Sequence, residues 1–202
     1  MRIIKLDSIF KNDNRESLAY ILDSLNNDGV FIYPTDTIYG IGGNFFSLDV
    51  VKRIDEIKGR GDKPYSVAVS DFEMLKTIVK NVPNVFTEKY LKLLPGKYTF
   101  LFEISEFINS ALVKGSTKIG IRIPNLTEIL KLISLFKKPI ITTSINETGK
   151  QPLNSIDNII EFIKRKNIEK KINFIIDAGN FTHSYASTII DITQNTPKNI
   201  RN

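Results

Sequence analysis

The sequence predicts an α/β fold, built as a single domain over residues 1–202. Two observations support this class. Short runs of β-branched and aromatic residues recur along the chain, and segments with apolar residues at helical spacing separate them. A length of 202 residues suits one substantial domain. We find no internal repeat, low-complexity tract or interdomain linker in the sequence, so we expect the elements to share one core.

The expected strands are short runs rich in Ile, Val, Phe and Tyr, bounded by turn-forming or polar residues. The first half of the chain contributes residues 2–6, 30–33 and 65–69. The second half contributes residues 98–104, 118–123, 139–143, 174–177 and 187–192. Pro34 and Pro124 end two of these strands, because proline has no N–H to donate to a neighbouring strand.

The expected helices carry apolar residues three or four positions apart, which places those residues on one face. Asn14 is a candidate N-cap for the first helix, and Gly29 ends it. A second helix is expected at residues 49–58, and Ser70 or Asp71 caps a third that runs to about Lys80. The remaining helices are expected at residues 87–94, 126–136 and 156–165.

The composition excludes several classes of protein. The chain has a formal charge of +6, no cysteine and one histidine, so disulfides and thiolate chemistry are excluded. A positive charge favours polyanionic partners such as nucleotides or RNA, although the lysines are spread along the chain and can form an ordinary solvated surface. No apolar run approaches the roughly 20 residues of a membrane span. The N-terminus lacks the apolar core of a signal peptide. We therefore expect no membrane association and a cytoplasmic location.

Residues 30–44 form the first candidate for a ligand site. A strand buried on both faces opens after Pro34 into three short side chains that carry oxygen, Thr35, Asp36 and Thr37. Glycines follow, and they let a ligand come close to the backbone. By itself this pattern also fits a strand followed by an irregular turn.

Other residue types narrow the chemistry. His183 is the only histidine, and neither a Walker loop nor a Rossmann fingerprint occurs. The acids are scattered, so we expect no metal site. What remains is a set of cations, hydroxyls and one amide that suits a triphosphate bound beside a carboxylate: Lys58, Arg60, Lys63, Arg122, Ser144, Asn146, Ser187 and Thr188. Each has a simpler explanation, such as a helix C-cap for Lys58 and Arg60 or a surface ion pair for Arg122.

Seven motifs in one order resemble the YrdC-like family over nearly the whole chain. They are Pro34-Thr35-Asp36-Thr37-Ile38-Tyr39-Gly40, Lys58-x-Arg60, Lys63-Pro64, Pro95-Gly96, Ile121-Arg122-Ile123-Pro124, Ser144-x-Asn146 and Ser187-Thr188. The resemblance implies a twisted, mixed β-sheet with flanking helices and a basic central cavity. It also implies the short bacterial type of the family. The long form adds a linker and a second domain, and this chain ends before either.

Members of this family make threonylcarbamoyl-adenylate for tRNA modification from L-threonine, bicarbonate and ATP. In the implied reaction, an N-carboxylate of threonine attacks the α-phosphorus of ATP and expels pyrophosphate. By resemblance, threonine contacts fall on Thr35, Arg122, Thr142 and Ser187. ATP contacts fall on Lys58, Arg60, Lys63, Lys118, Ser144, Asn146 and Arg201, with Mg²⁺ bridging the phosphates. Four of these are the implied catalytic residues: Lys58, Arg60, Ser144 and Asn146. The expected downstream partners are tRNA and the complex that transfers the threonylcarbamoyl group.

Three departures from the family pattern matter. Ala68 stands where many members carry a histidine, so one threonine contact is expected to be lost or replaced. The loop from Arg60 to Lys63 is one residue shorter than usual, with Gly61 in place of proline. Asn202 stands where a glycine usually follows the arginine that aligns with Arg201.

Two alternatives remain within the same fold. The first is a non-catalytic RNA-binding member, which would lack the Lys-x-Arg and Ser-x-Asn pairs that this chain keeps. The second is the carbamoyl-adenylate-forming module of hydrogenase-maturation proteins, which sits in far larger chains with zinc-finger cysteines. For the catalytic interpretation, we expect Lys58 and Arg60 to be exposed cations whose replacement leaves the fold intact.

Overall fold

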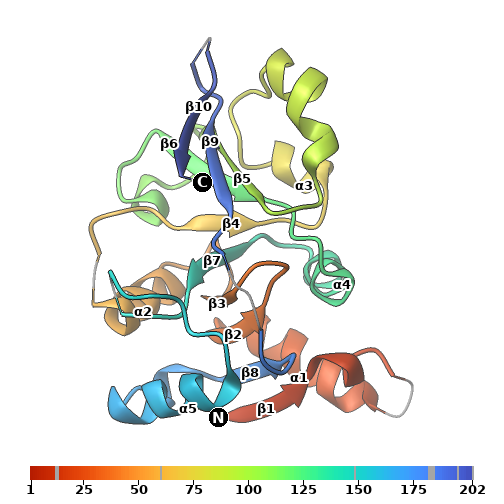
Figure 1. The fold of residues 1–202 in the computed structure, drawn as a ribbon, viewed down its shortest axis with the longest axis vertical. Coiled ribbons are helices and arrows are strands. Elements are labelled where there is room, and N and C mark those ends of the chain that lie inside the picture. The colour runs from red at the N-terminus through yellow and green to blue at the C-terminus, as the bar shows by residue number, and fades with distance from the viewer. Residues whose placement is uncertain (12–13, 60, 148, 182–184, 195, 202) are drawn as a thin grey trace.

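The computed structural model describes residues 1–11, 14–59, 61–147, 149–181, 185–194 and 196–201. Within these ranges the chain forms one twisted, open sheet of ten strands, in the order β1-β8-β2-β3-β7-β4-β6-β5-β9-β10. Figure 1 shows the sheet running from β1 at the bottom to β10 at the top, with helices beside it. The predicted α/β class is therefore confirmed.

The strands are short, and their directions are mixed. Their bounds are β1 Arg2–Lys5, β2 Phe31–Pro34, β3 Tyr39–Gly42, β4 Ser66–Ala68, β5 Tyr98–Glu103, β6 Lys118–Arg122, β7 Ile140–Ser144, β8 Phe174–Asp177, β9 Thr188–Asp191 and β10 Lys198–Arg201. Parallel pairs join β8 to β1 and β2, β4 to β6, and β5 to β9. The other neighbours are antiparallel, so the sheet is mixed, as the family resemblance implies.

Five α-helices lie in the described ranges: α1 Arg15–Asn26, α2 Leu48–Lys58, α3 Phe72–Lys76, α4 Thr127–Phe136 and α5 Ile156–Arg165. Three of them begin at a side chain that accepts a backbone N–H, namely Ser47, Asp71 and Ser155. Asn14 precedes α1, but its side chain accepts a hydrogen bond from the Ser17 hydroxyl instead of capping the helix. Gly59 ends α2 in the left-handed conformation, with φ 62°.

The alternation of side chains along the strands divides the core between the two faces of the sheet. In β2, Phe31 and Tyr33 pack with apolar residues of α1 and α4, whereas Ile32 packs with residues of α2 and α5. In β7, Ile140 and Ile141 divide in the same way. Both faces are therefore covered by helices, which explains why the strands are almost continuously apolar.

Two strands, β3 and β10, were not predicted, and two helices differ from their predicted form. The glycines of β3 were interpreted as a loop, but a Cβ at Gly42 would lie 2.0 Å from the Ile141 carbonyl oxygen, so glycine permits close pairing with β7. The strand β10 was not predicted. All four of its residues are exposed, so its sequence has no strong apolar pattern. The helix expected to reach Lys80 ends at Lys76, and Val79 instead bridges to Ile104.

The helix expected at residues 87–94 is also irregular. A π-helical turn, η3, covers Phe86–Tyr90, and a 3₁₀ turn, η4, covers Leu91–Leu93. Three further 3₁₀ turns in the described ranges are η1 Leu6–Ser8, η5 Ser110–Val113 and η6 Glu169–Lys171. None of the helices in the described part of the chain is long and apolar enough to span a membrane.

Candidate active site

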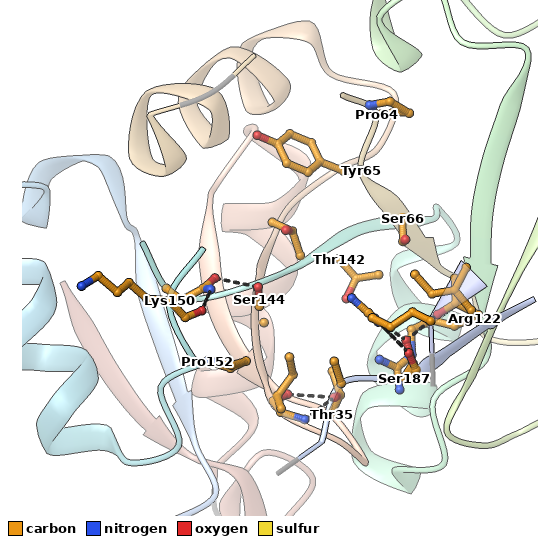
Figure 2. Close-up of a pocket in the computed structure, with 18 residues that line it drawn as sticks. Thr35, Pro64, Tyr65, Ser66, Arg122, Thr142, Ser144, Lys150, Pro152 and Ser187 are labelled. Carbon is orange, nitrogen blue, oxygen red and sulfur yellow. Dashed lines mark hydrogen bonds between the residues drawn. The ribbon is translucent and has the colours of Figure 1, made fainter. Parts of the chain in front are cut away.

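A cavity of about 410 Å³ opens at the middle of the sheet. Its walls come from the β2–β3 turn, from strands β3 to β7, and from β9 and β10. Seven of the predicted site residues line it: Thr35, Thr142, Ser144, Asn146, Ser187 and the two arginines Arg122 and Arg201. Figure 2 shows Ser144 and Arg122 approaching the cavity from different sides, with Thr142 between them.

The β2–β3 turn carries a directed chain of hydrogen bonds. The Thr35 hydroxyl donates to the Ile38 carbonyl oxygen at 2.8 Å and lies 2.9 Å from the Thr37 hydroxyl. A hydroxyl has one proton, so Thr37 is the donor of that second bond. Thr37 in turn accepts from Nη1 of Arg122 at 3.1 Å. The turn therefore fixes Arg122 and Thr35 relative to each other.

Asp36 completes what we call the arginine cluster, made of Thr35, Asp36, Thr37 and Arg122. The Asp36 carboxylate accepts a hydrogen bond from Nη2 of Arg122, and only 7% and 6% of the two side chains are exposed. Two buried atoms of this pair, Oδ2 of Asp36 and Nε of Arg122, have no hydrogen-bond partner. A buried ion pair of this kind is stabilising only while both members remain, because either alone is an uncompensated buried charge.

Ser187 is held between two other strands. Its hydroxyl lies 2.8 Å from the Thr99 hydroxyl, and its carbonyl oxygen accepts from Nε and Nη2 of Arg201 at 3.1 and 2.9 Å. Burial, and then the charge of Arg122, hold the pKa of the Arg201 guanidinium below its ordinary value. Two guanidinium groups therefore border the same cavity. Because their positive charges repel, an anion bound near them would lower the electrostatic free energy of both.

Thr142 and Gly40 form the floor between these residues. Gly40 faces Thr142, since a Cβ on it would lie 3.6 Å from the Thr142 hydroxyl oxygen. Behind them, Tyr33 is fully buried and donates a long hydrogen bond of 3.4 Å to the Ile141 carbonyl oxygen. Burial raises the pKa of Tyr33 to about 12, so its hydroxyl stays neutral at ordinary pH.

Ser144 and Asn146 lie on the opposite wall, and Lys58 lies behind them. We call these three residues the lysine cluster. The ammonium of Lys58 donates to the carbonyl oxygens of Ser144 and Asn146 at 2.7 and 3.1 Å, and to Oδ1 of Asn146 at 2.6 Å. The Ser144 hydroxyl donates to the same Oδ1 at 2.6 Å. The last residue of α2 is thereby attached to the end of β7.

The position of Lys58 differs from the expectation of an exposed cation. The residue is only 7% exposed, and it does not itself line the cavity. Its three N–H groups already have oxygen acceptors. The expectation failed because the helix end that carries Lys58 packs against the loop after β7, a contact between residues 86 positions apart.

The remaining predicted cations lie away from the cavity or outside the described residues. Lys63 is exposed and does not line the cavity. Lys118 is paired with Asp191 at 2.8 Å. Burial alone would raise the pKa of Asp191, but hydrogen bonds from Lys118 and Thr193 outweigh it and hold that pKa below its usual range. Arg60 and His183 lie outside the described residues.

Several lining residues were not predicted from the sequence. They are mostly small or polar: Ser66, Thr99, Lys150 and Pro152, with Pro64 and Tyr65 beside them. Thr99 sits inside an apolar strand, and no local signal marks it, because its role depends on the distant Ser187. Lys150 could have been suspected, since it follows closely after Ser144-x-Asn146 in a glycine-containing loop.

Ala68, which replaces a family histidine, is completely buried and pairs with Arg122 of β6 and Ile140 of β7. It does not line the cavity, whereas Ser66, two residues earlier in β4, does. Acidic groups that could hold a metal ion are also missing here. Within the described ranges, no three His, Cys, Asp or Glu side chains gather closely enough to bind one.

A family model named for Sua5, YciO and YrdC, and described as telomere recombination, matches residues 23–202. The chain belongs to the Sua5–YciO–YrdC family. Membership of this family confirms the resemblance inferred from the seven motifs.

Curated relatives in this family share the name threonylcarbamoyl-AMP synthase. The protein from Pyrococcus abyssi is 33% identical over 170 residues, which cover 84% of this chain and 48% of that protein. The protein from Buchnera aphidicola is 32% identical over 152 residues, which cover 74% of this chain and 80% of that protein. This chain thus spans about half the length of the first relative and most of the second.

A solved structure of Pyrococcus abyssi Sua5 in complex with L-threonine has the same fold. It superposes with a TM-score of 0.85 and 28% sequence identity, over 99% of this chain and 56% of that one. The YrdC-like fold that the seven motifs imply is therefore confirmed.

Proposed function

We propose that this protein is a threonylcarbamoyl-AMP synthase, which forms threonylcarbamoyl-AMP and pyrophosphate from L-threonine, bicarbonate and ATP. One observation carries the proposal: the arginine cluster and the lysine cluster border a single cavity, where hydroxyl groups lie between them. Such a cavity suits two ligands that must react with each other, because it holds a carboxylate and a phosphate chain at once. The names of the curated relatives support the same activity.

For threonine, the arginine cluster supplies the recognition. The planar guanidinium of Arg122 has N–H groups beyond those donated to Asp36 and Thr37, and these suit a carboxylate. Thr35, Thr142 and Ser187 then provide small hydroxyls around the amino-acid side chain. The Sua5 complex with L-threonine supports this assignment, since that protein shares the fold and family of this chain.

For ATP, the lysine cluster supplies charge and hydrogen bonds. Lys58 reaches a phosphate directly only by exchanging one of its three bonds, so we assign it mainly to electrostatic attraction and to holding Ser144 and Asn146. Arg201 borders the same cavity. Arg60, Lys63 and Lys118 remain proposed contacts that a bound nucleotide would have to reach.

Mg²⁺ is expected to accompany ATP. In the described residues no cluster of acids is available to hold it. This donor set fits Mg²⁺ bound chiefly by phosphate oxygens and water, which is its usual mode with nucleotides. The ion would neutralise part of the triphosphate charge, and the cavity side chains would orient the rest.

The chemical step follows from this arrangement. The amine of threonine bonds to the carbon of bicarbonate, and a water molecule is lost to give an N-carboxylate. One oxygen of this carboxylate then bonds to the α-phosphorus of ATP. The bond from the α-phosphorus to the bridging oxygen breaks, and pyrophosphate leaves with that oxygen's electron pair. The residues named here position the reactants and stabilise the growing negative charge, without a covalent protein intermediate.

We further propose that residues 1–202 act as one domain, in the cytoplasm, and that tRNA and a transfer complex use the product afterwards. The family match over residues 23–202 and the continuous sheet support a single unit. On this basis, the first step needs no RNA.

Pyrophosphate release tests the proposal. Purified protein with ATP, Mg²⁺, threonine and bicarbonate should release pyrophosphate, and omission of either threonine or bicarbonate should abolish it. The adenylate should be identified by mass spectrometry. The proposed function would be contradicted if pyrophosphate were released equally with and without threonine, or if the protein bound RNA and released no pyrophosphate.

A further inference from the structure

We propose that Tyr39, Asn154, Gly179 and Phe181, here named the tyrosine cluster, position the loop that carries Ser144 and Asn146 for ATP. The inference rests on the proposed function and concerns side chains outside the cavity. Neither Tyr39 nor Asn154 nor Phe181 lines it, so the cluster acts through other residues. They are positioning residues and not catalytic ones.

The first tie is made by the Tyr39 hydroxyl. It donates to the carbonyl oxygen of Gly179 at 2.8 Å and accepts from the backbone N–H of Ala178 at 2.8 Å. Tyr39 is completely buried, and burial raises its pKa to about 12, so the hydroxyl keeps the proton it donates. Both its donor and its acceptor capacity are used, and they fix the chain just after β8 to the start of β3.

The second tie joins that segment to the loop after β7. The N–H of Phe181 donates to the Asn154 carbonyl oxygen at 2.8 Å, and Nδ2 of Asn154 donates back to the Phe181 carbonyl oxygen at 3.2 Å. The Phe181 ring lies against the Tyr39 ring, with 4.9 Å between ring centroids. Two reciprocal bonds and one ring contact therefore hold residues 154 and 181 together beside Tyr39.

The third tie closes a ring of contacts around the loop. The N–H of Ile145 donates to the Tyr39 carbonyl oxygen at 3.3 Å, and the N–H of Leu153 donates to the Ile145 carbonyl oxygen at 3.1 Å. Ile145 lies between the two residues of the Ser144-x-Asn146 motif. Inside the ring, Nδ2 of Asn146 donates to the Lys150 carbonyl oxygen at 2.5 Å. The tyrosine cluster therefore anchors both ends of the loop whose inner residues border the cavity.

This arrangement predicts an effect on ATP that is separate from threonine. The Tyr39 carbonyl oxygen accepts from the N–H of Ile145, and the side-chain contacts of Tyr39 in the described part of the chain are with Ala178, Gly179 and Phe181, not with Arg122 or Thr35. Losing the hydroxyl should therefore weaken ATP binding and leave threonine binding nearly unchanged. A role confined to global stability would lower the affinities for ATP and threonine together, or would change neither.

The test compares Tyr39→Phe with Tyr20→Phe, a control outside the cavity in which the lost hydroxyl donates a long bond of 3.4 Å to the Asn173 carbonyl oxygen. Hydrogen exchange should be measured at the amides of Ala178, Phe181 and Leu153. Affinity for ATP should be measured by calorimetry without threonine, and affinity for threonine without ATP. Tyr39→Phe should speed exchange at Ala178 and Phe181 and weaken ATP binding, each about five- to tenfold, as expected for one or two lost hydrogen bonds. Tyr20→Phe should do neither.

A second variant protects the test if Tyr39→Phe folds poorly. Asn154→Leu removes the side-chain donor to the Phe181 carbonyl oxygen without adding a charge, and should give the same pattern at a smaller size. If ATP binds equally to the wild type and both variants, with unchanged exchange, the positioning role is overturned. If the wild type binds no ATP, the proposed function itself fails, and the exchange data still report whether the ties exist.

Discussion

The arginine cluster and the lysine cluster both bury a cation beside the same cavity, but they compensate its charge in different ways. Arg122 is paired with the Asp36 carboxylate, and the two side chains are 6% and 7% exposed. Lys58 donates instead to three neutral oxygens, those of two backbone carbonyls and one amide. Both cations are almost inaccessible, yet Arg122 contacts a carboxylate, whereas these three bonds of Lys58 run to backbone and amide oxygens.

The difference assigns a task to each cluster. An ion pair carries little net charge, so the arginine cluster offers geometry and hydrogen-bond donors, which suit a singly charged carboxylate. The bonds of Lys58 instead order Ser144 and Asn146 at the cavity wall, and its ammonium adds positive charge near the place proposed for the triphosphate. Substitutions should therefore act differently on the two sides of the cavity.

The largest expected effect on stability is at Arg122. Arg122→Ala leaves the Asp36 carboxylate buried without its partner, and breaking a buried pair in this way costs about 3–5 kcal/mol. Urea denaturation followed by circular dichroism measures the change. The double variant Arg122→Met with Asp36→Asn should recover much of the loss, since no buried charge remains. A double variant as unstable as Arg122→Ala alone would show that the charges are not the cause.

Lys58→Ala should act mainly on turnover. Losing this charge and the order it imposes on Ser144 and Asn146 should lower the rate of adenylate formation about ten- to a thousandfold, the range for a lost electrostatic donor. It should also destabilise the fold, because three buried oxygens lose a donor. Lys52→Ala, on the same helix but exposed, is the control and should change neither quantity. A normal rate in folded Lys58→Ala would remove Lys58 from the site.

Selectivity for the amino acid should be more modest. Thr35, Thr142 and Ser187 are small residues around the proposed threonine pocket, so threonine should exceed serine by about 10–200-fold, the margin for one methyl group. Valine should do worse, because pocket hydroxyls would be left unpaired. Competition assays with all three amino acids measure this. Equal use of the three amino acids would mean that the pocket does not exist. Because Ala68 replaces a histidine that is expected to contact threonine, this assay tests whether the remaining residues hold the amino acid.

The smallest effect concerns pH and the pair of Lys118 with Asp191. The folded state lowers the pKa of Asp191, so the stabilisation is fully present above the unfolded-state pKa of about 3.9 and is lost as pH falls through the lower folded-state value. The free energy of unfolding of the wild type should therefore approach that of Asp191→Asn below about pH 4. A constant difference from pH 7 to pH 3 would show that the pair does not titrate in this way.

Sequence reasoning predicted the α/β class and most elements because strand and helix periods are local properties. It also named Thr35, Ser144 and Asn146, which line the cavity, since short polar side chains at the ends of buried strands are visible in the sequence. It missed β3, because glycine usually indicates a loop. In this protein, Gly42 is required because a Cβ there would lie 2.0 Å from the Ile141 carbonyl oxygen of the neighbouring strand β7.

The sequence by itself determined most of the buried strands and the polar side chains near their ends. Only the tertiary structure decided how those side chains are paired. Lys58 is buried rather than exposed because its acceptors lie 86 and 88 positions away. Asp36 neutralises Arg122 from 86 positions away, and Thr99 meets Ser187 across 88. Such pairings follow from strand order in the sheet, and strand order depends on the packing of the whole chain, which no local pattern encodes.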